Sequence, residues 1–80
     1  MKVKILVIDD ESEIRNLLKE VLLTEGYEVD VTSNGAEGLE IIKKKGPFDI
    51  VLTDSKMPTL DGIELRKHIS KNWPELAIII

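Results

Sequence analysis

Two short runs of this chain are apolar at nearly every position, and each ends directly on acidic residues. Residues 3–8 are followed by Asp9 and Asp10, and residues 50–53 are followed by Asp54. Strands with apolar side chains on both faces are typical of a parallel sheet between two layers of helices. The pattern therefore predicts two central strands that carry carboxylates at their carboxyl ends.

The segment after the first run predicts an amphipathic helix. Its apolar residues recur three and four positions apart, at Ile14, Leu17, Leu18, Val21 and Leu22. This spacing forms one apolar stripe, which is expected to face a core. Either Asp10, with Glu13 three positions later, or Ser12 is expected to cap the start of the helix. Gly26 is expected to end it.

The next segment predicts an edge strand and a second helix. Residues 27–33 alternate between polar and apolar, which is typical of a half-covered strand. Asn34 is followed three positions later by Glu37, the signature of a capped helix start. Gly46 and Pro47 are expected to end this helix.

A third helix and a fourth strand complete the pattern. The helix is expected to start at Asp61 and to end at Trp73 and Pro74, with Leu65 and Ile69 on its inner side. Residues 76–80 are apolar and predict the last strand.

Strands that alternate with single helices require right-handed crossovers and a parallel sheet. The edge-like second strand beside fully apolar first and third strands predicts the spatial order 2-1-3-4. The crevice between the first and third strands is then the point where such sheets bind ligands. Asp9, Asp10 and Asp54 are expected to meet there.

Three carboxylates in one crevice favour a hard divalent cation. Two of them about 4 Å apart repel each other by about 4 kcal/mol at an effective dielectric of about 20, so the group is expected either to hold a proton with a raised pKa or to bind a cation. With no Cys and a single His, the oxygen ligands select Mg²⁺, Mn²⁺ or Ca²⁺ over zinc. Taken alone, Asp10 could be only a helix cap and Asp54 only a turn residue. Their joint position at one sheet edge favours the metal site.

Composition narrows the class of protein. Eighty residues allow one domain, residues 1–80, and the absence of Cys suits a reducing compartment such as the cytoplasm. The formal charge of −4 argues against a nucleic-acid surface, and no apolar run is long enough to span a membrane.

Several motifs resemble the signatures of bacterial response-regulator receiver domains. They are Val7-Ile8-Asp9-Asp10-Glu11, Gly26-Tyr27-Glu28-Val29, Asn34-Gly35-Ala36-Glu37-Gly38-Leu39, Leu52-Thr53-Asp54-Ser55-Lys56-Met57-Pro58 and Leu60-Asp61-Gly62-Ile63-Glu64-Leu65. The resemblance runs through all 80 residues and implies a flavodoxin-like fold. It implies a signalling module, not an enzyme, whose partner in the intact form is a histidine kinase or a phosphotransfer protein.

The resemblance also assigns roles to single residues. It implies that Asp54 accepts the phosphoryl group and, with Asp10, binds Mg²⁺, while Asp9 acts mainly through a metal-bound water. The backbone carbonyl of Lys56 is the further implied ligand. The Lys56 ammonium is expected to be a solvated loop charge, with shielding of the phosphoryl group as the alternative.

The family has five strand–helix rounds, whereas this chain stops at Ile80 after the fourth strand. The Ser or Thr after that strand, and the Lys at the end of the fifth, are therefore missing from this truncated domain. Metal binding is expected to survive better than phosphorylation, and switching is not expected to survive. The strand of residues 76–80 has no outer neighbour, so we expect homo-oligomers, formed through its edge or by exchange of elements.

Two other functions compete. A haloacid-dehalogenase-type phosphatase also uses an Asp nucleophile and Mg²⁺, but it needs a second Asp at the position of Lys56, so this reading is disfavoured. The other is a structural or engineered self-associating fragment without signalling activity, in which the acidic cluster is only inherited.

Overall fold

The structure, a computed structural model of the chain, describes residues 2–53 and 62–79, without the side chains of residues 62 and 63. Strands and helices alternate as predicted. In chain order they are β1 (Lys4–Ile8), α1 (Ser12–Thr24), β2 (Glu28–Thr32), α2 (Gly35–Lys45), β3 (Ile50–Thr53), α3 (Gly62–Asn72) and β4 (Ala77–Ile79). The predicted strands differ from these bounds by no more than one residue at either end.

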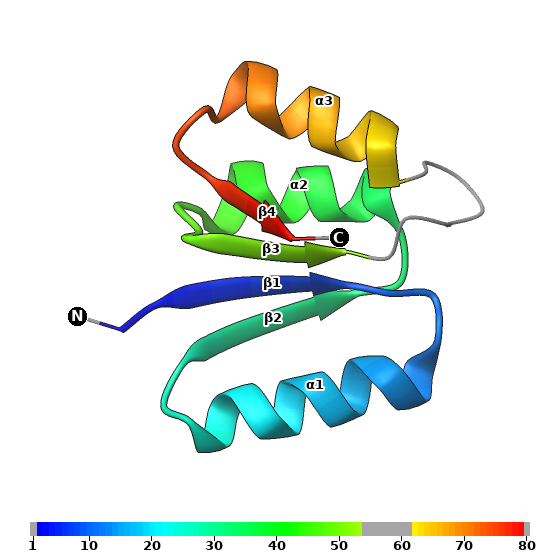
Figure 1. Cartoon of the computed structure of the whole chain (residues 1–80), viewed down its shortest axis with the longest axis vertical. Coiled ribbons are helices and arrows are strands. Elements are labelled where there is room, and N and C mark those ends of the chain that lie inside the picture. Colours follow the sequence, from blue (N-terminus) through cyan, green and yellow to red (C-terminus); the bar gives the residue numbers. More distant parts are fainter. Residues whose placement is uncertain (1, 54–61, 80) are drawn as a thin grey trace.

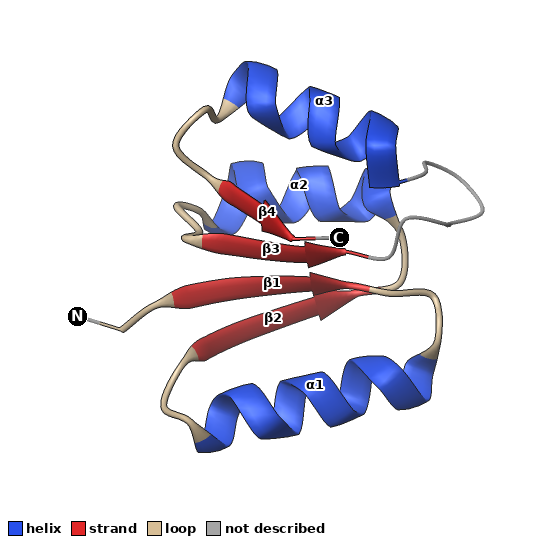
Figure 2. Cartoon of the chain, in the orientation of Figure 1, coloured by secondary structure: helices blue, strands red, loops and turns tan. Residues whose placement is uncertain are grey.

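The four strands form one parallel sheet in the order β2-β1-β3-β4, which confirms the predicted topology. α1 lies on one face of the sheet, and α2 and α3 lie on the other (Figure 1). The strands all point in the same direction, so their carboxyl ends share one edge of the sheet (Figure 2).

The core lies between the sheet and the layer of α2 and α3. Its buried members are Leu6, Ile8, Ile42, Phe48, Val51, Leu65 and Ile69. Leu65 and Ile69 are fully buried, as the sequence predicts for the inner side of the third helix. Burial of these large side chains is the main force that holds α3 on the sheet.

The opposite face of the sheet is only half covered. α1 packs against β1 and β2, and none of its residues is fully buried. Leu17 on α1 stays 57% exposed and Ile79 on β4 54% exposed. A hollow of about 250 Å³ on this face is lined by Leu18 of α1, Leu52 of β3 and Ile79 of β4, among others. An apolar surface of this kind marks an interaction site or an aggregation liability.

The two helix starts differ in how they are capped. Asn34 caps α2 as predicted, because its side-chain Oδ1 accepts the backbone N–H of Glu37 at 2.7 Å. For α1 the predicted caps are wrong. The N-cap residue is Glu11, whose side chain makes no capping bond. The carboxylate of Asp9 instead accepts the N–H of Glu11 at 2.9 Å, so the turn before the helix is closed by the first acidic residue.

Gly26 follows the end of α1, as predicted. Its φ of 91° lies in the left-handed region that glycine adopts without strain, and it directly follows the C-cap residue Glu25.

The Asn34 cap yields a stability prediction. Asn34→Ala removes the acceptor for the Glu37 N–H, and we expect it to lower the free energy of unfolding by about 1 kcal/mol. Asn34→Ser keeps a capping oxygen and serves as the control, with a much smaller loss. Urea unfolding followed by circular dichroism measures both, and equal stability of the two variants would show that the cap contributes nothing.

Candidate functional site

The carboxyl ends of β1 and β3 lie side by side. In the parallel register Ile8 lies opposite Thr53 on one side and Thr32 of β2 on the other. The N–H of Asp9 donates to the carbonyl of Thr32 at 3.1 Å, which extends the β1–β2 pairing by one residue. The backbone of Asp9 is therefore fixed at the edge of the sheet where β3 also ends.

The side chain of Asp9 is partly engaged. Its Oδ1 accepts the N–H of Glu11, and the residue is half-buried. Its carbonyl oxygen accepts a hydrogen bond from Nη1 of Arg15 at 2.7 Å. One carboxylate oxygen of Asp9 thus holds the turn, while the other has no partner in the described part of the chain.

Asp10 offers a freer carboxylate. The residue is exposed, and among the described residues its side chain makes no hydrogen bond or ion pair. Asp9 and Asp10 therefore differ as metal ligands: one carboxylate is tied to the backbone and the other is free. A freely exposed carboxylate suits direct coordination of a cation, whereas the tethered one has less freedom to move toward it.

Arg15 is a site-proximal residue that the sequence does not reveal. Helical spacing alone places it on the surface of α1, yet its guanidinium reaches back across the turn to the Asp9 carbonyl. Every residue has a backbone carbonyl, so the sequence does not show which one a side chain binds. Only the geometry of the turn shows that Arg15 supports the acidic end of β1.

Asp54 and Lys56 lie outside the described residues, so their predicted places stay predictions. Thr53, the last described residue of β3, is buried at the sheet edge opposite Ile8. Within residues 2–53 and 62–79, no three acidic or histidine side chains come together as a metal site. Asp9 and Asp10 thus supply two carboxylates, and any third carboxylate ligand would come from outside the described residues.

These two carboxylates fit Mg²⁺. This cation is commonly held by one or two carboxylates and fills its remaining positions with waters and phosphate oxygens. The exposed setting of Asp10 leaves room for such ligands.

In the described residues no helix is long and apolar enough to cross a membrane.

Comparison with known proteins identifies the family. The model of the response regulator receiver domain matches residues 5–80. The chain is 42% identical over 80 residues to sporulation initiation phosphotransferase F of Bacillus subtilis, and 42% identical over 74 residues to the DNA-binding transcriptional regulator NtrC of Escherichia coli. The chain belongs to the response regulator receiver domain family.

Solved structures agree. The response regulator TrrA of Thermotoga maritima, solved in complex with Mg²⁺ and BeF, aligns with a TM-score of 0.91 at 45% identity and covers 100% of this chain. A CheY-like receiver domain of Methanospirillum hungatei aligns with a TM-score of 0.93 at 33% identity over 98% of the chain. The fold is flavodoxin-like, as the resemblance implied.

The relatives are longer than this chain. It spans 64% of the Bacillus phosphotransferase, 16% of NtrC, and 68% and 62% of the TrrA and Methanospirillum chains. The match to the first of these covers all of this chain.

The difference between the two carboxylates yields a prediction for metal binding. We expect Asp10→Asn to weaken Mg²⁺ binding about tenfold or more, because it removes the freely exposed charged ligand. Glu20→Gln, the same loss of charge at an exposed position of α1, is expected to leave affinity within about twofold, since exposed charges farther away are screened. A Mg²⁺ titration followed by ¹H–¹⁵N NMR measures both, and equal affinities would contradict the assignment.

Proposed function

We propose that residues 1–80 make up part of a receiver domain and act as the phosphoacceptor of a two-component response regulator. Asp54 accepts the phosphoryl group, and Asp9, Asp10, Asp54 and the backbone carbonyl of Lys56 hold Mg²⁺. The observation that supports this best is the register that sets Ile8 opposite Thr53. Asp9 directly follows the first of these residues in the sequence and Asp54 directly follows the second.

In the proposed reaction an oxygen of the Asp54 carboxylate attacks the phosphorus atom of a phosphohistidine. The new P–O bond forms as the P–N bond breaks, and the imidazole of the donor leaves. Bound Mg²⁺ would neutralise charge on the phosphoryl oxygens. The residues of this chain hold the acceptor edge in place: the Thr32 carbonyl and the Arg15 guanidinium both fix the backbone of Asp9.

The proposed partner is a histidine kinase or a phosphotransfer protein, and the proposed location is the cytoplasm. The Bacillus relative is named a phosphotransferase, and TrrA was solved with Mg²⁺ and BeF, which supports the same chemistry for this chain. We do not propose a catalytic turnover of its own, because receiver domains are signalling modules. With a net charge of −4, we propose no nucleic-acid contact for this domain.

Beryllofluoride tests this function, because it mimics a phosphoryl group on a carboxylate. With Mg²⁺ present, we expect a protein-bound ¹⁹F resonance that Asp54→Asn abolishes. Asp30→Asn is the control, since Asp30 lies on β2 and its Oδ1 is 3.7 Å from the ammonium of the exposed Lys45. No bound resonance in the unchanged chain would favour the alternative, a self-associating fragment without signalling activity.

The half-covered face supports a proposal on assembly. We propose that the chain forms homo-oligomers, through the outer edge of β4 or by exchange of elements. Among the described residues β4 pairs only with β3, and Ile79 on β4 remains largely exposed. Strands with an unpaired edge are templates for pairing with another chain.

Sedimentation velocity at micromolar concentration tests the assembly. We expect species larger than the 9.0 kDa monomer, with a fraction that grows with concentration. Ile79→Lys, which puts a charge on the β4 edge, is expected to shift the distribution toward the monomer. A folded chain that sediments as a monomer at all concentrations would contradict the proposal.

A further inference from the structure

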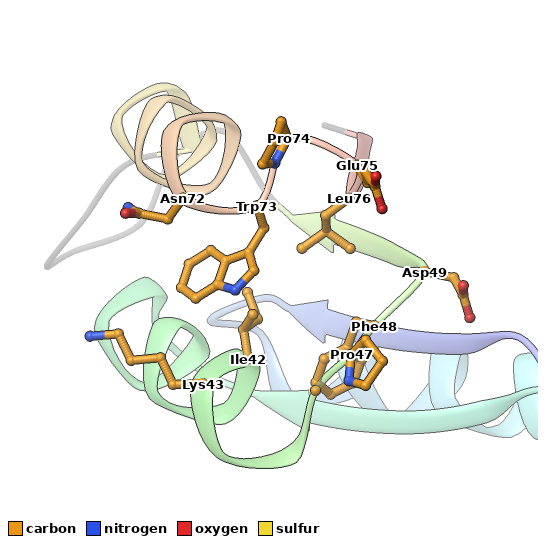
Figure 3. A pocket seen from close by; sticks show the side chains of 11 residues that line it. Ile42, Lys43, Pro47, Phe48, Asp49, Asn72, Trp73, Pro74, Glu75 and Leu76 are labelled. Atoms are coloured by element: carbon orange, nitrogen blue, oxygen red, sulfur yellow. The ribbon is translucent and has the colours of Figure 1, made fainter.

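A groove lies at the end of the sheet opposite to Asp9. It is formed where α2 ends, where β3 begins and where the connection from α3 leads into β4 (Figure 3). Its volume is about 630 Å³, which is within the range of about 300–1,000 Å³ that ligand sites occupy. The groove lies on the side of α2 and α3, away from the half-covered face.

The walls of the groove are apolar. Trp73 and Leu76 form one wall and Pro47 and Phe48 the other, with Ile42 between them (Figure 3). These walls continue the buried core, because Ile42 and Phe48 belong to it and Trp73 and Leu76 pack against it. Aromatic walls of this kind supply most of the contact energy in recognition sites.

The two ends of the groove carry opposite charge. Lys43 lies at one end, while Asp49 and Glu75 lie at the other (Figure 3). Asp49 uses one oxygen to accept the backbone N–H of Lys4 at 2.8 Å. In the described part of the chain neither carboxylate forms an ion pair with a lysine or arginine. This end is therefore suited to a cation from a partner.

The groove also contains unpaired hydrogen-bonding groups. The indole N–H of Trp73 has no acceptor among the described residues, although the residue is half-buried. Asn72 donates its Nδ2 to the carbonyl of His68 at 2.9 Å, which leaves its Oδ1 as an acceptor. Asn72 lies on the Lys43 side of the indole, so the donor beside the apolar wall is the Trp73 N–H, which matches a C=O group of a peptide backbone (Figure 3).

We propose that this groove binds a short peptide segment of a partner protein in which an aromatic side chain is followed by Arg or Lys. The aromatic ring packs between Trp73 and Phe48, and the basic side chain reaches Asp49 and Glu75. A backbone carbonyl of the peptide accepts a hydrogen bond from the Trp73 indole N–H. This surface is separate from the proposed phosphoacceptor edge, so its test does not depend on Asp54.

The single tryptophan of the chain makes the test direct, because it gives one indole N–H signal in a ¹H–¹⁵N spectrum. The probe is the capped dipeptide acetyl-Phe-Arg-amide at millimolar concentration. We expect a saturable shift of the indole signal. Acetyl-Phe-Glu-amide, which reverses the charge, and acetyl-Gly-Arg-amide, which lacks the ring, are expected to bind at least several-fold more weakly. No indole shift with the first peptide would overturn the proposal, as would equal binding of all three.

A matched pair of variants tests whether the arginine of the peptide binds at Glu75. Glu75→Gln is expected to weaken binding of acetyl-Phe-Arg-amide about two- to fivefold, the range of an exposed ion pair. Glu25→Gln removes the same charge at the end of α1 and is expected to leave binding unchanged. Equal affinities of the two variants would overturn the role of Glu75. A shift produced just as strongly by methylguanidinium would show a site for small cations and overturn the peptide assignment.

Discussion

The parallel register between β1 and β3 is the constraint on which the rest of the structure depends. It sets Ile8 opposite Thr53, so that the two central strands stop at the same edge of the sheet. Both residues are buried, and a slip by one position would exchange the side chains that face α1 for those that face α2 and α3. The same burial that stabilises the sheet thereby fixes where the acidic residues after each strand begin.

At the carboxyl edge of the sheet, charge repulsion destabilises the turn after β1 and hydrogen bonds stabilise it. Adjacent carboxylates repel, yet the turn after β1 is held by bonds to backbone groups, from Asp9 to Glu11 and from Arg15 to the carbonyl of Asp9. These bonds keep the backbone in place without neutralising Asp10. A divalent cation would offset the remaining repulsion, and this would link the fold to the chemistry proposed for this chain.

The two ends of the sheet carry different surfaces. The carboxyl edge is acidic and polar, whereas the opposite edge opens into the groove of Trp73 and Phe48. β3 runs between them, from Ile50 near the groove to Thr53 at the acidic edge. The half-covered face with α1 is a third surface, which is apolar and exposed at Leu17 and Ile79. The three surfaces therefore differ in the partner they suit: a cation, a peptide and an apolar surface.

Local sequence signals predicted the strands, the topology and the α2 cap, because apolar periodicity and the Asn34–Glu37 pair act over a few residues. The cap of α1 was predicted wrongly, since three acidic residues in a row leave open which of them closes the turn. Arg15 was missed because its acceptor is a backbone carbonyl. The groove is formed by segments that are far apart in the sequence, so no local pattern predicts it. The placement of Asp54 stays a prediction.

Paramagnetic Mn²⁺ tests most directly whether the two strand ends share one cation site. It broadens NMR signals of nuclei close to the bound ion, so substoichiometric Mn²⁺ reports which residues surround it. The account predicts that the backbone signals of Asp10 and Asp54 broaden together, at the same metal concentration and before those of Glu13 and Glu20 on α1. Broadening at Asp10 without Asp54, or spread evenly over the acidic residues of α1, would contradict a shared site.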